Sequence, residues 1–101
     1  MRLGRVVLAL TLGLVAGCGF GRSAAPGDDP DARSRALVEA GNQAFRAGDY
    51  DLAARRYGAA AVVKKDDPAA YYGLGMALSR LGRDEDARAA YVKARQLAQE
   101  R

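Results

Sequence analysis

The chain has 101 residues, a formal net charge of +4, one cysteine, and neither histidine nor tryptophan. That length allows one small domain at most. A lone cysteine without histidine excludes a disulfide framework, a Cys/His zinc cluster, a Ser-His-Asp triad and a histidine general base, so we expect no enzyme, no catalytic residue, no metal and no cofactor.

Residues 1–17 form a block that is charged at its start and then apolar. Arg2 and Arg5 supply the positive charge, and residues 6–17 contain no charged side chain. Twelve helical residues rise about 18 Å, which is short for a bilayer core of about 30 Å. The block is therefore typical of a cleaved secretory signal peptide, with a buried N-terminal helix as the alternative.

The end of this block carries a more specific pattern. The run Leu-Val-Ala-Gly-Cys at residues 14–18 resembles the bacterial lipobox, in which an aliphatic residue and two small residues precede an obligatory cysteine. The resemblance implies cleavage before Cys18, with lipid on its sulfur and on its new α-amino group. The alternative is an unmodified thiol that follows an ordinary signal peptide.

The lipobox interpretation predicts where the mature protein resides. Lipid on Cys18 would hold it in the bacterial cell envelope. Gly19, in place of an aspartate, favours the periplasmic face of the outer membrane. In a Gram-positive host, the plasma membrane would be the location instead. Loss of Arg2 and Arg5 lowers the formal charge from +4 to +2, so we expect no nucleic-acid partner.

The remaining chain divides into a linker and a helical part. Residues 18–29 are rich in Gly, Ser and Pro and predict a flexible linker. Asp-Pro pairs at residues 29–30 and 67–68 place a capping carboxylate before a proline at the first helical position. Gly48 and Gly82 mark helix ends. The helical part, residues 30–101, is predicted to form helices at 30–47, 50–64, 68–81 and 84–99.

An internal repeat aligns the two predicted helical hairpins when the chain is shifted by 34 residues. Seven positions are then identical, and they are Ala36/Ala70, Gly41/Gly75, Arg46/Arg80, Gly48/Gly82, Ala53/Ala87, Tyr57/Tyr91 and Ala60/Ala94. The spacing Gly-x6-Gly-x4-Ala-x3-Tyr-x2-Ala occurs twice and resembles the tetratricopeptide repeat over residues 34–101. The resemblance implies an all-α fold, a short α-solenoid with two helix-turn-helix repeats at about residues 34–67 and 68–101.

The same resemblance implies a packing role for each residue of the spacing. Gly41 and Gly75 leave room where the two helices of a repeat cross, and Gly48 and Gly82 allow a positive φ at the turn. The second helices supply small contact residues and one tyrosine each, which are Ala53, Tyr57 and Ala60 in the first repeat and Ala87, Tyr91 and Ala94 in the second.

The resemblance also implies a concave binding surface made by the first helix of each repeat. We refer to its eight residues as the first-helix surface, and they are Val38, Asn42, Phe45, Arg46, Tyr72, Met76, Ser79 and Arg80. This surface is apolar and aromatic with an arginine rim, which suits a partner helix or an extended peptide. The alternative is that these side chains cap the small core or form a dimer contact.

These features predict a non-catalytic, lipid-anchored adaptor for protein–protein interaction that assists assembly or stability of an envelope machine. One alternative is a structural stub that completes the solenoid of a partner, and another is a small-molecule binder or enzyme. Because three repeats are usually needed for independent stability, we also expect marginal stability or self-association. Its predicted site is an open face of residues 84–99 that carries Ala90, Val92 and Leu97.

Overall fold

The computed structural model describes residues 29–100, which form four helices and no strand. The helices are α1 (Pro30–Arg46), α2 (Tyr50–Val63), α3 (Pro68–Arg80) and α4 (Asp84–Gln99). All four begin at the predicted residue, and the first three end one residue earlier than predicted. The predicted all-α fold is confirmed. The predicted signal peptide, Cys18 and all but the last residue of the predicted linker lie outside the described residues.

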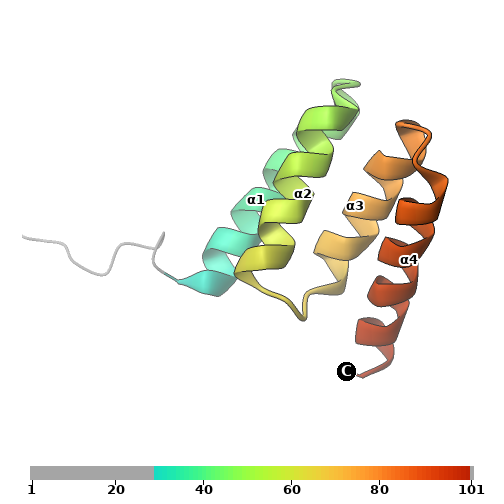
Figure 1. Ribbon diagram of the computed structural model, residues 1–101. Helices are drawn as coiled ribbons and strands as arrows, with labels where there is room; N and C mark the ends of the chain where they lie inside the picture. Colours follow the sequence, from blue (N-terminus) through green and yellow to red (C-terminus); the bar gives the residue numbers. More distant parts are fainter. Residues whose placement is uncertain (1–28, 101) are drawn as a thin grey trace, which may run out of the picture.

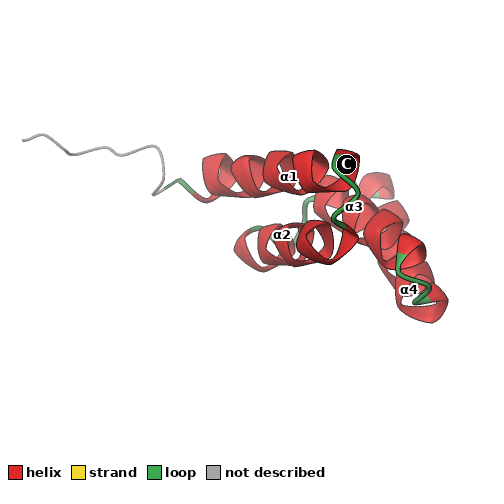
Figure 2. Ribbon diagram, turned by 90° about the horizontal axis from the view of Figure 1, so that it is seen from above, coloured by secondary structure: helices red, strands yellow, loops and turns green. Residues whose placement is uncertain are grey.

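The four helices form two antiparallel hairpins whose short turns lie at the same end of the molecule (Figure 1). The third helix, α3, lies against both α1 and α2, whereas α4 contacts only α3 among these helices. Seen from above, α4 therefore lies at one edge of the molecule (Figure 2). None of the helices of residues 29–100 is both long and apolar enough to cross a bilayer.

Aspartate side chains cap the start of three helices. The carboxylates of Asp29, Asp49 and Asp67 each accept a hydrogen bond, 3.0–3.1 Å long, from a backbone N–H in the first turn of α1, α2 and α3. Pro30 and Pro68 occupy the first helical position, where a missing N–H leaves no bond unmade. Local sequence is therefore sufficient to place these helix starts.

The fourth helix starts differently. Arg83 occupies the N-cap position of α4 and gives no side-chain cap. Its guanidinium instead binds the Asp86 carboxylate, with Nη2 and Oδ2 2.7 Å apart. Asp84, Glu85 and Asp86 place negative charge in the first turn, where it interacts favourably with the helix dipole.

Glycines with a left-handed backbone end the first helix of each hairpin. Gly48 has φ 82° and Gly82 has φ 78°. After each glycine the chain turns back, and the backbone N–H of Asp49 and of Arg83 bonds a carbonyl five residues earlier, 2.9 Å away in both cases. This geometry satisfies carbonyl groups at the helix end and suits glycine, which lacks a Cβ.

The core is built mainly from alanine. In residues 29–100 the buried hydrophobic side chains are alanines except for Tyr57, Leu78 and Leu97. Such small side chains fill little volume, so close packing requires the helix backbones to approach one another. The largest fully buried side chain is Tyr57 of α2, and the core is organised around its ring.

The predicted open face of α4 is wrong in part. Ala90 and Leu97 are buried, with exposed fractions of 7% and 6%, while Val92 is 37% exposed. Because α4 contacts only α3, the side of α4 that carries Ala90 and Leu97 is the side that packs on α3. The helical pattern gives the stripe of apolar residues correctly but not the direction in which it points.

Candidate binding surfaces

Tyr57 lies between two glycines that belong to different repeats. A Cβ added at Gly41 of α1 would lie 2.8 Å from Cδ1 of the ring, and one added at Gly73 of α3 would overlap the ring. The phenol O–H donates a hydrogen bond to the side-chain oxygen of Asn42. Burial raises the pKa of the Tyr57 phenol above its usual value, although the nearby Arg46 charge opposes this shift.

Tyr91 is the counterpart of Tyr57 in the second repeat, but it has a different environment. A Cβ added at Gly75 would lie 2.7 Å from its ring, as with Gly41 and Tyr57. Of the glycines in residues 29–100, only Gly75 has Tyr91 as its nearest neighbour. The ring also meets Tyr72, with 5.6 Å between the ring centroids, and remains partly exposed.

The α1 part of the first-helix surface is tied into the core. Val38 and Phe45 pack against buried side chains, and Asn42 accepts the bond from Tyr57. Arg46 is exposed and pairs with Glu39, with 3.7 Å between the charged atoms. Val38, Asn42 and Phe45 therefore contribute to the core, as the alternative interpretation of this surface has it, whereas Arg46 lies on the molecular surface.

The α3 part of this surface is more exposed. Tyr72 is 55% exposed, Met76 is half-buried, and Ser79 and Arg80 are exposed. Tyr72 and Met76 are four residues apart on one helix and therefore share a face. This part offers apolar and aromatic side chains to a partner.

Arg80 joins the two repeats at the end where the turns lie. Its guanidinium carbon is 5.1 Å from the ring centroid of Phe45 and 5.3 Å from that of Tyr50. Its Nη1 donates a 2.8 Å hydrogen bond to the hydroxyl of Tyr50. Sequence reasoning assigned Arg80 to a binding rim and missed these contacts, because they cross from α3 to α1 and α2.

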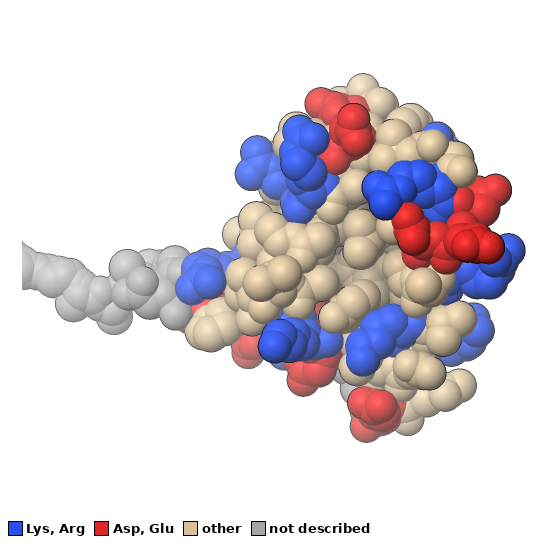
Figure 3. All heavy atoms as spheres, in the orientation of Figure 1, with Lys and Arg blue, Asp and Glu red and all other residues tan. Residues whose placement is uncertain are grey.

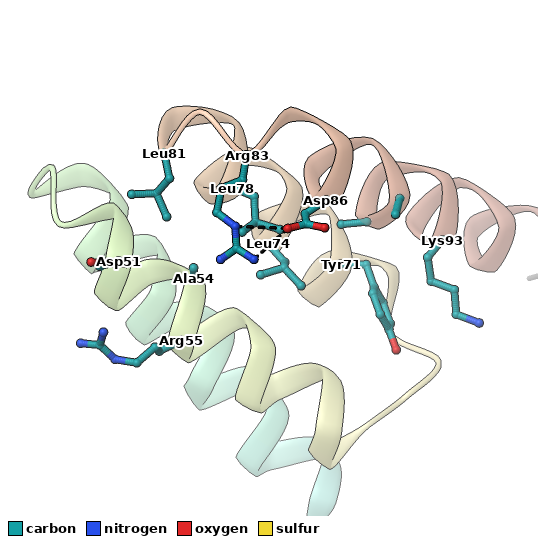
Figure 4. Close-up of a pocket in the computed structure, with 12 residues that line it drawn as sticks. Asp51, Ala54, Arg55, Tyr71, Leu74, Leu78, Leu81, Arg83, Asp86 and Lys93 are labelled. Atoms are coloured by element: carbon teal, nitrogen blue, oxygen red, sulfur yellow. Dashed lines mark hydrogen bonds and ion pairs between the residues drawn. The ribbon is translucent and has the colours of Figure 1, made fainter.

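A groove of about 580 Å³ opens between α2 and α4, with α3 as its floor. Leu74 and Leu78 of α3 lie on the floor, and the Arg83–Asp86 pair lies beside them (Figure 4). Asp51, Arg55 and Lys93 contribute charged groups of both signs to its lining. We call this hollow the α2–α4 groove, and none of the first-helix surface residues lines it. In the sequence, this groove is indicated by the helical spacing of Leu74, Leu78 and Leu81, which all line it.

A second hollow, of about 600 Å³, lies where the outer sides of α3 and α4 meet. We call it the tyrosine hollow, and its lining residues are Pro68, Ala69, Tyr72, Tyr91, Ala94, Arg95 and Ala98. Arg95 is the one charged side chain in this lining. Tyr72 connects the tyrosine hollow to the α3 part of the first-helix surface.

The third hollow, of about 320 Å³, is charged. Asp31, Arg35, Lys64 and Asp67 line it, and the Lys64 ammonium lies 3.3 Å from the Asp31 carboxylate. The hydrogen bond with Asp31 raises the pKa of Lys64. Charges of both signs also lie next to each other over the face drawn in Figure 3. Neither this hollow nor that face presents a field of a single sign.

Comparison with protein families agrees with this geometry. A family model described as TPR repeat matches residues 41–82, and one described as tetratricopeptide repeat matches residues 68–101. Together they cover residues 41–101. This chain is a tetratricopeptide-repeat (TPR) protein. No curated protein and no solved structure matches the chain.

TPR repeats commonly bind protein partners and are typically non-catalytic. In this TPR protein, the part of the chain that the structure describes has no group of three or more potential metal ligands from His, Cys, Asp and Glu. Among the described residues, the surfaces that present apolar side chains to a partner are the first-helix surface, the α2–α4 groove and the tyrosine hollow.

Gly73 is the residue that sequence reasoning missed in this TPR protein. Position 39, its counterpart in the first repeat, is a glutamate, so the internal repeat does not mark it. A glycine inside a helix is less favourable than alanine by about 1 kcal/mol, which by itself suggests a packing reason. That reason is the Tyr57 ring, which lies directly against α3 at this residue.

Proposed function

We propose that this TPR protein is a non-catalytic adaptor that binds a protein partner through the first-helix surface. The observation that carries the proposal is the exposed Tyr72, whose ring continues into the apolar lining of the tyrosine hollow. Met76 extends this apolar strip along α3. Aromatic and thioether side chains at such sites often act as anchors for a partner.

The test replaces both anchors by serine. Tyr72→Ser/Met76→Ser should retain its helical circular dichroism, because both side chains are already partly solvated. It should lose the proteins that the wild-type chain captures from its native envelope, since anchor residues supply about 1–2 kcal/mol or more each. Val62→Ser is the matched control, because Val62 is 74% exposed on α2 and lines none of the three hollows.

Two results would contradict this proposal. A folded double variant that captures the same proteins as the Val62→Ser control would exclude Tyr72 and Met76 as partner contacts. Loss of helicity in the double variant would instead assign both side chains to the core, which is the alternative interpretation of the first-helix surface. Circular dichroism and capture from the same preparation separate these two results.

We propose in addition that lipid on Cys18 anchors this adaptor in the bacterial cell envelope, at the periplasmic face of the outer membrane, where it assists assembly or stability of an envelope machine. The support is the sequence of residues 1–19: the charged start, the apolar run, the small residues before the cysteine, and Gly19 in place of an aspartate.

The anchor is tested by Cys18→Ser, because a hydroxyl cannot become the lipid thioether. We expect this variant as an uncleaved or soluble precursor, whereas Val62→Ser is expected at mature size in the detergent-extracted membrane fraction. Separation of inner and outer membranes by density then tests the location. Recovery of Cys18→Ser at mature size in the membrane fraction would refute the anchor and leave the binding proposal standing.

A further inference from the structure

The two equivalent tyrosines of this protein differ in what covers them. Tyr57 is fully buried, and the ring atoms Cδ1, Cε1 and Cζ are the ones that lie against both Gly41 and Gly73. Tyr91 has Gly75 in the place of Gly41, but no described glycine in the place of Gly73. Instead, its ring forms part of the lining of the tyrosine hollow. Within residues 29–100, the second repeat therefore exposes a surface whose equivalent on the first repeat is covered by α3.

The first repeat shows what kind of element covers this surface. There α3 places Gly73 on Tyr57 and packs Ala70 and Tyr71 in one cluster with Ala60 and Ala61. Thirty-four residues later, the equivalents of Tyr57, Ala60 and Ala61 are Tyr91, Ala94 and Arg95. All three of these equivalents line the tyrosine hollow. This hollow is thus the place on the second repeat that corresponds to the place of α3 on the first.

We propose that the tyrosine hollow binds an amphipathic α-helix of a partner protein, with a glycine over Tyr91 and an acidic side chain beside Arg95. This inference rests on the proposed function, because it specifies the partner that the adaptor binds. The helical form follows from the equivalent site, where α3 provides both the shape and the small residue.

The acidic side chain follows from the one charged residue of the hollow. Arg95 stands where the first repeat has Ala61, which is 9% exposed beneath α3. No ion pair links Arg95 to another residue within residues 29–100. An arginine beside an apolar docking site favours a carboxylate on the ligand, since its planar guanidinium donates two parallel hydrogen bonds.

A second copy of this chain fits the tyrosine hollow poorly in either orientation. In a head-to-tail stack, α1 of the next copy would take the place of α3 and would put Glu39 where Gly73 lies. Even a Cβ at Gly73 overlaps the tyrosine ring, so a glutamate there prevents the same approach. In a symmetric pair, two unpaired Arg95 side chains would enter one interface whose lining has no acidic residue.

Site-specific photo-cross-linking in the native host tests this inference. A benzoylphenylalanine replaces Ala98 in the tyrosine hollow, Ser79 on the first-helix surface, or Val62 as the background control. We expect the Ala98 site to form an adduct with a partner segment that carries an acidic residue and a glycine at helical spacing. No such adduct is expected at Val62.

Charge reversal then tests the role of Arg95. Arg95→Glu should lower the yield of the Ala98 adduct by about tenfold or more, because a charge-assisted bond is replaced by repulsion. Arg88→Glu is the matched control, since Arg88 is exposed on the same helix, lies outside the hollow lining and changes the net charge equally. Exchange of the cross-linked partner acid for arginine should restore the adduct in Arg95→Glu.

The outcomes separate this inference from the proposed function. Adducts at Ser79 without any at Ala98 would overturn the helix site and leave the adaptor proposal intact, whereas no adduct at either position would overturn both. An Ala98 adduct with another copy of this chain would overturn the partner helix, because the hollow would then be a contact between two copies. If Arg95→Glu and Arg88→Glu lowered the yield of the Ala98 adduct equally, the acidic side chain beside Arg95 would be overturned.

Discussion

Glycines within the helices are of two kinds. Gly41, Gly73 and Gly75 lie against a tyrosine ring, so that a Cβ at any of them would be 2.8 Å or less from a ring atom. Gly58 of α2 has no such neighbour within 4 Å. The same residue type therefore contributes packing at three positions and only lowers helix propensity at the fourth.

This difference predicts opposite effects of alanine at two positions. Gly73→Ala should lower the free energy of unfolding by about 1–3 kcal/mol, because the added methyl group overpacks the core against Tyr57. Gly58→Ala should raise it by up to about 1 kcal/mol, because alanine is the better helix former. Urea unfolding followed by circular dichroism measures both. Changes of the same sign at the two positions would contradict the register of α3 on α2.

The buried phenol of Tyr57 predicts a dependence of stability on alkaline pH. Burial raises the pKa of this phenol in the folded state above its unfolded value of about 10. The protonated phenol therefore contributes to stability fully below pH of about 10, and this contribution is lost as pH rises through the folded pKa, because the unfolded chain releases the proton first. The free energy of unfolding should therefore fall above pH of about 10.

Tyr57→Phe provides the comparison for this pH effect. At neutral pH it should be less stable by about 1 kcal/mol, because the hydrogen bond to Asn42 is lost. Above pH of about 10 its stability should fall less steeply than that of the wild type. Urea midpoints at pH values on both sides of 10 measure this difference, and parallel curves for the two proteins would show that the Tyr57 phenol does not titrate with folding.

At the scale of elements, helix starts depend on individual carboxylates. Asp49 accepts a hydrogen bond from the backbone N–H of Leu52 at the start of α2, whereas Asp51 lies in the first turn and is exposed. Both residues place negative charge near the positive end of the helix dipole. Only Asp49 also satisfies a backbone donor that the helix itself leaves unbonded.

Alanine at these two positions separates capping from charge. Asp49→Ala should lower the free energy of unfolding by about 1 kcal/mol, because the cap bond is lost. Asp51→Ala should lower it by about 0.3–0.5 kcal/mol, the usual effect of one exposed charge on the dipole. Thermal unfolding at low and high salt distinguishes them, since salt should reduce the Asp51 effect more. If the two variants lost equal free energy of unfolding, and salt reduced both losses equally, Asp49 would act only by its charge.

At the scale of the whole molecule, α3 and Arg80 hold the two repeats together. The third helix is the only one in contact with both α4 and the first hairpin, and Arg80 adds ring contacts with Phe45 and Tyr50 at the turn end. An exposed cation–π contact contributes about 0.5–1 kcal/mol. This contribution adds to the packing of α3 on α1 and α2, which couples the two hairpins.

Arg80→Ala should therefore lower the free energy of unfolding by about 1–2 kcal/mol, through the loss of two ring contacts and a hydrogen bond. Arg80→Lys should recover only part of this, because lysine lacks the planar guanidinium. A double-mutant cycle with Tyr50→Phe isolates the hydrogen bond, and Arg88→Ala controls for removal of an exposed arginine. Additive effects of Arg80→Ala and Tyr50→Phe would mean that the 2.8 Å bond adds no stability.

The sequence by itself was sufficient to predict the positions of the helices and the repeat register. Aspartate caps, prolines at the first helical position, and glycines at the turns act within one turn of the chain, so the residues that determine a helix end are its immediate neighbours. The 34-residue spacing then related one hairpin to the other. The first-helix surface, taken from the TPR resemblance, stays a prediction.

Only the tertiary structure decided which side of each helix is covered. Gly73 against Tyr57, Arg80 on Phe45 and Tyr50, and the inward direction of Ala90 and Leu97 all depend on contacts between different helices. An alanine-rich stripe looks alike whether it meets a neighbouring helix or solvent, because its residues are small and weakly apolar. The rotation of each helix, and with it the tyrosine hollow, is therefore set by how large rings and glycines fit together across the hairpins.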